Sequence, residues 1–103
     1  MKISLESPDN WNDLWTESNT PFAFYSVTNA GKATGSPKEC YAFGLLIVFT
    51  ADISTYYSGW RNIQIYIEDS SNGNSDRGRI YIRSNNRDNT GWKLFTGSKI
   101  DLA

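Results

Sequence analysis

The sequence predicts an all-β fold, mainly antiparallel, built as a small β-sandwich with one short helix near the N-terminus. Two segments, residues 61–68 and 78–84, alternate apolar and polar side chains with a period of two, the pattern of half-buried strands. A loop of turn-forming residues separates them. A third segment, residues 40–50, is apolar on both faces, as in a strand between two layers. Together these observations favour packed sheets.

The two alternating segments fit each other in one antiparallel register. When Ile67 stands opposite Ile80, every other pair also matches in kind: Tyr66 with Tyr81, Ile65 with Ile82, Glu68 with Arg79, and Gln64 with Arg83. One face then consists of isoleucines, and the other carries an aromatic, an ionic and an amide–guanidinium pair. Such pairs contribute roughly 0.2–1 kcal/mol each. A slip of one residue would mix the two faces, so the register is well specified.

The remaining elements are shorter. Residues 8–15 have the pattern of a helical turn, with Ser7 as N-cap, Pro8 in the first position, and Trp11, Leu14 and Trp15 on one side. Strands are expected at residues 22–28 and 92–95, and residues 2–5 are either a short strand or a linker. The chain is therefore divided into an N-terminal extension or linker, residues 1–10, and one domain, residues 11–103.

The composition of the chain argues against several classes of function and partner. The 103 residues carry a formal net charge of −1, which argues against nucleic acid as a partner. No apolar run is long enough to insert into a membrane. The chain has one cysteine, Cys40, and no histidine, so the common catalytic triads and most zinc sites are excluded. We therefore expect no catalytic residues, no metal, no cofactor and no enzymatic activity.

Exposed aromatic side chains are the main functional clue. Aromatic residues make up 15% of the chain, which is high. The non-isoleucine face of the predicted hairpin combines flat rings with arginine and glutamine, a set that suits a sugar because rings cover its apolar face while the guanidinium binds hydroxyls. The expected ligand-binding residues are Trp60, Tyr66, Tyr81, Arg83 and Trp92. The alternative is that these rings pack against another subunit or beneath the loops.

Several segments in order resemble the knob domain of phage tail fibres, which is also found in R-type pyocin fibres. The resemblance lies in Asn12-Asp13-Leu14, Thr28-Asn29-Ala30, Ser36-Pro37, residues 41–49, Gln64-Ile65-Tyr66, Ile80-Tyr81-Ile82-Arg83-Ser84 and Gly91-Trp92-Lys93-Leu94. It spans roughly residues 11–95. The chain departs from the family pattern in Pro21-Phe22-Ala23, where glycine is usual, in the single closing tryptophan, and in the long insert at residues 52–60.

The resemblance implies a homotrimeric domain near the tip of a virion tail fibre, which adheres to bacterial cell-surface polysaccharide without chemistry. The alternative is a structural module that trimerises or attaches to other tail or virion proteins and has no ligand of its own. The two-faced strand at residues 41–49 independently favours a homotrimer, because so small a chain cannot bury both faces well alone. The two functions differ in whether the aromatic side chains line an open groove or lie under a partner chain.

Overall fold

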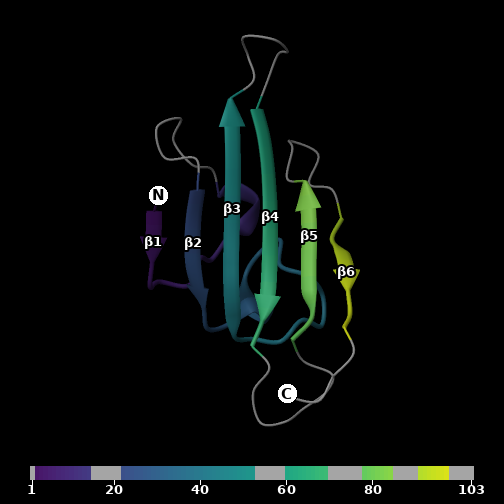
Figure 1. Cartoon of the computed structure of the whole chain (residues 1–103). Helices are drawn as coiled ribbons and strands as arrows, with labels where there is room; N and C mark the ends of the chain where they lie inside the picture. The colour runs from purple at the N-terminus through teal and green to yellow at the C-terminus, as the bar shows by residue number, and fades with distance from the viewer. Residues whose placement is uncertain (1, 15–21, 53–59, 70–77, 85–90, 98–103) are drawn as a thin grey trace, which may run out of the picture.

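The computed structural model describes residues 2–14, 22–52, 60–69, 78–84 and 91–97. They form one sheet whose six strands lie side by side in chain order (Figure 1). The strands are β1 (Lys2–Ser4), β2 (Phe22–Val27), β3 (Gly44–Asp52), β4 (Trp60–Glu68), β5 (Ile80–Ser84) and β6 (Lys93–Phe95). β1 runs parallel to β2, and every other neighbouring pair is antiparallel. The prediction of a mainly antiparallel all-β fold is confirmed.

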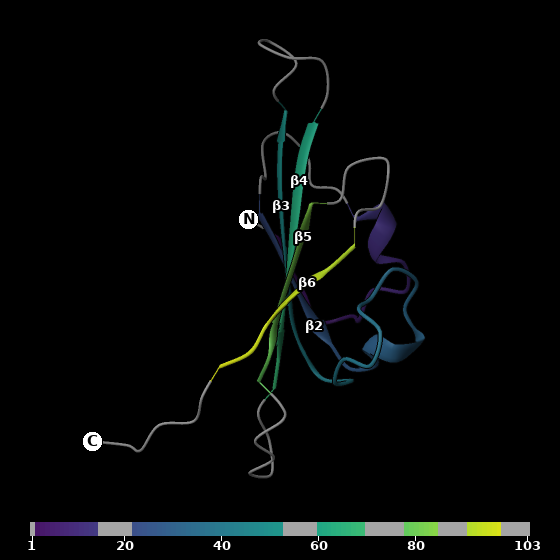
Figure 2. The same cartoon turned by 90° about the vertical axis from the view of Figure 1, so that its right-hand side faces the viewer.

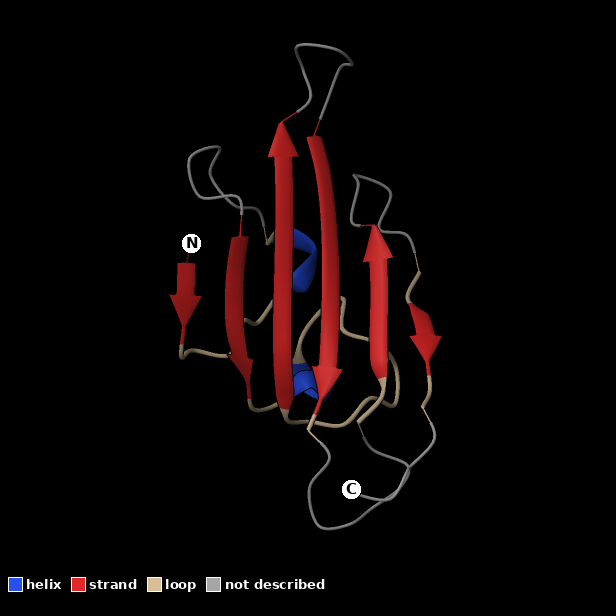
Figure 3. Ribbon diagram, in the orientation of Figure 1, coloured by secondary structure: helices blue, strands red, loops and turns tan. Residues whose placement is uncertain are grey.

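The second layer of the described structure is made of loops rather than strands. Two short 3₁₀ helices, η1 (Trp11–Asp13) and η2 (Ala30–Lys32), lie with their flanking segments on one side of the sheet (Figures 2 and 3). The described residues therefore supply a single sheet, where the sequence analysis expected a sandwich of two. None of the described helices is both long and apolar enough to cross a membrane.

The predicted helix over residues 8–15 was wrong. Of the described residues in this range only those of η1 are helical, and the cap of η1 is Asn10, whose side chain accepts a hydrogen bond from the Asn12 N–H. Asn10 is extended and forms a bridge with Thr34 in a distant loop: the Thr34 N–H donates to the Asp9 carbonyl at 2.8 Å, and the Trp11 N–H donates to the Thr34 carbonyl at 2.8 Å. These long-range bonds use backbone groups that a local helix would need.

The hairpin register was predicted correctly. Tyr66 stands opposite Tyr81, Ile67 opposite Ile80, and the pairs further along β4 and β5 follow in step. The Glu68–Arg79 pair forms an ion pair at 2.9 Å beside the last rung of the ladder. β3 pairs with β4 over nine positions, from Gly44–Glu68 to Asp52–Trp60. The tyrosine face and the isoleucine face of the hairpin therefore continue onto β3.

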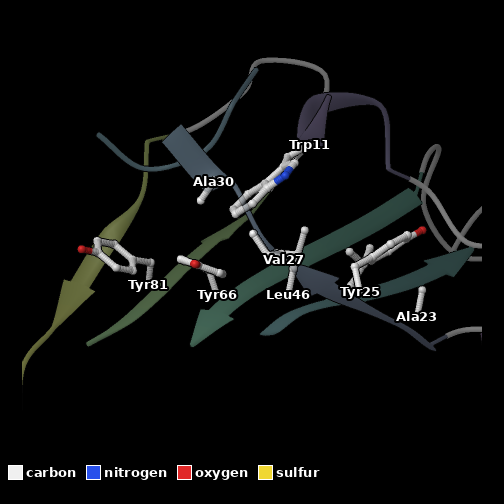
Figure 4. Packing of buried hydrophobic residues seen from close by; sticks show 9 residues of the cluster. Trp11, Ala23, Tyr25, Val27, Ala30, Leu46, Tyr66 and Tyr81 are labelled. Carbon is white, nitrogen blue, oxygen red and sulfur yellow. The ribbon is translucent and has the colours of Figure 1, made fainter. Parts of the chain in front are cut away.

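The core lies between the sheet and the loop layer. Its buried members are Trp11, Ala23, Tyr25, Val27, Ala30, Leu46, Val48, Tyr66 and Tyr81 (Figure 4). Trp11 comes from η1 and packs edge-on against the Tyr66 ring with centroids 5.1 Å apart. The tyrosine face of the hairpin is therefore the inner face of the sheet, and the isoleucine face is the outer one.

Candidate functional site

The aromatic and polar face expected to meet a ligand lies inside the protein. Tyr66 is fully buried, and Tyr81 and Arg83 are each only about 5% exposed. The expectation that these three side chains form an open surface was wrong, and the alternative, that they pack beneath the loops, is what the structure has. They cannot line a groove while the loop layer stays in place.

Hydrogen bonds explain why this face is covered by loops. A loop layer brings backbone carbonyl and N–H groups that need partners when buried. The sheet supplies those partners: Gln64 Nε2 donates to the Trp11 carbonyl at 2.7 Å, and Tyr66 Oη donates to the Tyr41 carbonyl at 2.6 Å. Asn62 Nδ2 likewise donates to the Leu14 carbonyl at 3.2 Å. A face of isoleucines could not have satisfied these groups.

Arg83 is buried and connects Gln64 on β4 with Trp92, which precedes β6. Its Nε donates to Gln64 Oε1 at 2.9 Å, and its guanidinium lies over the Trp92 ring, 4.5 Å from the centroid. Among the described residues no carboxylate pairs with it, and its buried Nη2 lacks a hydrogen-bond partner. Burial lowers the pKa of Arg83 to about 10, so it remains charged at neutral pH. Trp92 is half-buried and donates from Nε1 to the Gly35 carbonyl at 2.8 Å, which ties the last strand to the loop layer.

Glu68 anchors the other end of the inner face. Its carboxylate accepts hydrogen bonds from Arg79 Nε at 2.9 Å, from the Tyr41 N–H at 2.7 Å and from Tyr81 Oη at 3.2 Å. Burial alone would raise the pKa of Glu68, but the bonds from Arg79 and Tyr41 outweigh it and hold the pKa below its usual value. The bond to Glu68 correspondingly raises the pKa of Arg79. Burial raises the pKa of the Cys40 thiol to about 11, so it is not an activated nucleophile at neutral pH.

The Glu68 network makes stability depend on pH. Because the pKa of Glu68 is lower in the folded state, its contribution is complete above the unfolded pKa and is lost as the pH falls towards the folded pKa. We expect Glu68→Gln to lower the free energy of unfolding at pH 7 by about 2 kcal/mol, the scale of hydrogen bonds to a charged group. Urea unfolding of both proteins should show this difference shrinking below about pH 4, near the ordinary glutamate pKa. A difference that stays constant or grows towards acid would contradict the assignment.

Other expected features fall outside the described residues. The backbone of Trp60 begins β4, but its side chain lies outside them, as do the insert at residues 53–59 and the loops at residues 70–77 and 85–90. Of the five expected site residues, the structure brings together Arg83 and Trp92 directly and stacks Tyr66 with Tyr81 at 6.2 Å. Within the described ranges, no group of three or more acidic or cysteine side chains is placed to hold a metal ion.

The exposed feature that stands out is the outer side of the sheet, here called the outer apolar face. Its side chains alternate with the buried ones along β2 to β5 and stand in three rows across the strands. The rows are Phe22–Phe49–Ile63–Ser84, Phe24–Ile47–Ile65–Ile82 and Ser26–Leu45–Ile67–Ile80. Phe22, Leu45 and Ile80 remain 42%, 38% and 37% exposed. Figure 2 shows the strands edge-on, with both 3₁₀ helices on the opposite side.

The chain matches no protein-family model, no curated protein and no solved structure. The sequence identifies both faces and their members, but the expectation that the tyrosine face meets a ligand placed the buried face on the outside. The signal that could have corrected it is the set of amide and carboxylate side chains on the tyrosine face, which match the needs of a buried loop layer.

Proposed function

We propose that this chain is an assembly module, which joins protein subunits through the outer apolar face and performs no chemistry. The observation that supports this most is the contiguous set of isoleucine, leucine and phenylalanine side chains on β2 to β5, which no described residue covers. Soluble monomers rarely expose contiguous apolar patches beyond a few hundred Å², and larger ones mark interaction sites. A sheet face of this kind normally packs on a second layer.

The resemblance to the tail-fibre knob domain suggests where such an assembly module would act. A homotrimeric tail-fibre domain of a phage or phage-like particle needs a surface that holds copies together or attaches them to other virion proteins, and the outer apolar face suits either role. The inner residues Tyr66, Tyr81 and Arg83 then stabilise the subunit. In this proposal they bind no ligand.

The test uses Ile65→Lys, which places a charge in the central row of the outer apolar face. Because a charge there must be desolvated on assembly, we expect the variant to fold but to be missing from purified particles, as measured by quantitative mass spectrometry. Gly31→Lys is the matched control, since it adds the same charge on η2, on the other side of the sheet, where an added Cβ atom meets nothing within 4 Å. Normal incorporation of Ile65→Lys would refute the proposal.

Adhesion to bacterial polysaccharide is the second candidate, and a different surface favours it. Phe43 is 46% exposed and makes an edge contact with the Tyr41 ring at 5.7 Å between centroids. Arg79 is held close by, because it bonds Glu68, whose carboxylate also accepts from the Tyr41 N–H. Exposed rings beside an arginine are the combination that suits a sugar.

Phe43→Ala tests this second candidate. We expect it to weaken adsorption of the protein to host cells by about tenfold, equivalent to about 1.4 kcal/mol, without changing the melting temperature. Leu94→Ala is the control, because Leu94 is comparably exposed but lies on the edge strand β6 and outside the outer apolar face. Equal adsorption by the two folded variants would remove Phe43 from any glycan site.

A further inference from the structure

Across β2 to β5, the three rows of the outer apolar face offer no charge with which to select a dissimilar partner; Lys93, which registers with Ile82, stands at the margin on β6. The three rows contain isoleucine, leucine, phenylalanine and serine alone. Specific contacts between different proteins commonly rely on complementary charges. A neutral apolar face is complementary to a copy of itself without any such pattern. The chemistry of these rows therefore favours the same chain as the partner.

The edges of the sheet are poor sites for association. β1 and β6, the two edge strands, are three residues long, and each carries a lysine, Lys2 and Lys93. Short edge strands with lysines are a common way of preventing strands of another chain from adding to a sheet. The inner face is already covered by η1 and η2 (Figure 2). Of the surfaces of the described sheet, the outer apolar face remains for contact between copies.

The size of the face also suits a contact between copies. Four strands about 4.8 Å apart, each contributing five residues at about 3.4 Å, span roughly 20 Å in both directions once side chains are included. That is about 400 Å² in projection and more in accessible area. The flanking residues Ile3 and Phe95, which register with Phe24 and Ile80, widen the face towards the roughly 800 Å² per partner of standard interfaces.

We propose that the occupant of the outer apolar face is a second copy of this chain, so that the sheets of neighbouring copies stack face to face. Stacked sheets lie about 10 Å apart and interdigitate their side chains, here the isoleucines of the central row with the phenylalanines and leucine around them. The β-sandwich expected from the sequence is then completed between chains. This inference rests on the proposed assembly function and names its partner.

The experiment is sedimentation equilibrium of the purified full chain at tens of micromolar. We expect a mass of two or three times 11.6 kDa for the wild-type protein. Ile65→Lys, and Leu45→Lys at the end of the same face, should weaken association by at least tenfold and shift the mass towards one chain. Gly31→Lys should keep the wild-type mass. Far-UV circular dichroism identifies the variants that are folded, and either face variant is sufficient.

Two outcomes overturn the proposal. One is a wild-type chain that sediments at the mass of a single chain. The other is an oligomer whose mass neither folded face variant reduces, because its interface then lies elsewhere. Failure here is distinguishable from failure of the assembly function: a monomeric chain whose incorporation into particles still depends on Ile65 has another virion protein as the occupant.

Discussion

Trp11→Ala is expected to remove about 3–5 kcal/mol from the free energy of unfolding, the range for loss of a large buried aromatic side chain. Trp11 is fully buried and contacts both Tyr66 and Trp92 edge-on, with centroids 5.1 and 5.9 Å away. Its indole N–H donates to the Pro8 carbonyl at 3.2 Å. Because native proteins have only about 5–15 kcal/mol of stability, this loss removes a large fraction of the total.

Chemical denaturation followed by tyrosine and tryptophan fluorescence measures the effect. Trp11→Phe is the matched variant, since it keeps a ring against Tyr66 but loses the hydrogen bond to Pro8. Its free energy of unfolding should lie between those of the wild type and Trp11→Ala. Phe43→Ala, at an exposed ring, should change stability by no more than about 0.5 kcal/mol. If Trp11→Ala lowered the free energy of unfolding as little as Phe43→Ala does, the loop layer would not be part of the core.

Gly44→Ala is also expected to have a large effect, a loss of about 3 kcal/mol of stability, at the upper end of overpacking costs. Gly44 begins β3, opposite Glu68, where the backbone of β4 approaches closely. A Cβ atom there would clash with the Ile67 carbonyl oxygen and lie 2.8 Å from the Tyr66 ring. Neither the ladder nor the buried ring can move aside easily, so β3 or the loop before it must shift.

Gly31→Ala is the control for Gly44→Ala. Gly31 lies in η2, where an added Cβ meets nothing within 4 Å, so the substitution should be neutral or stabilising by up to about 1 kcal/mol. Thermal melting of the two variants measures the contrast. Equal melting temperatures would mean that the close approach at Gly44 does not exist in solution.

Much of the sheet could be predicted from the sequence because its signals are local. The alternation in β4 and β5 gives strand type and register together, since only one register pairs like with like. The η1 region could not be read this way, because the extended pairing of Asp9 and Trp11 with Thr34 depends on a loop far along the chain. Local propensity favoured a helix that these tertiary bonds replace.

The candidate site was harder to predict, because hydropathy alone does not say which face of a sheet is inside. The isoleucines outrank tyrosine, glutamine and arginine on any apolar scale, yet the polar face is the buried one. The covering layer decides which face is buried, because buried loops need hydrogen-bond partners and Gln64 and Glu68 provide them. The sequence names the residues of both faces, but the choice between them requires the position of the loops.

The most direct test of this assignment compares Ile65→Lys with Tyr66→Lys, adjacent positions on opposite faces of β4. Circular dichroism during thermal melting is the measurement. Ile65→Lys should keep a cooperative transition, since its lysine can extend into solvent from a partly exposed face. Tyr66→Lys should show none, because it buries an unpaired charge beneath Trp11. A cooperative transition in Tyr66→Lys and its loss in Ile65→Lys would contradict the account.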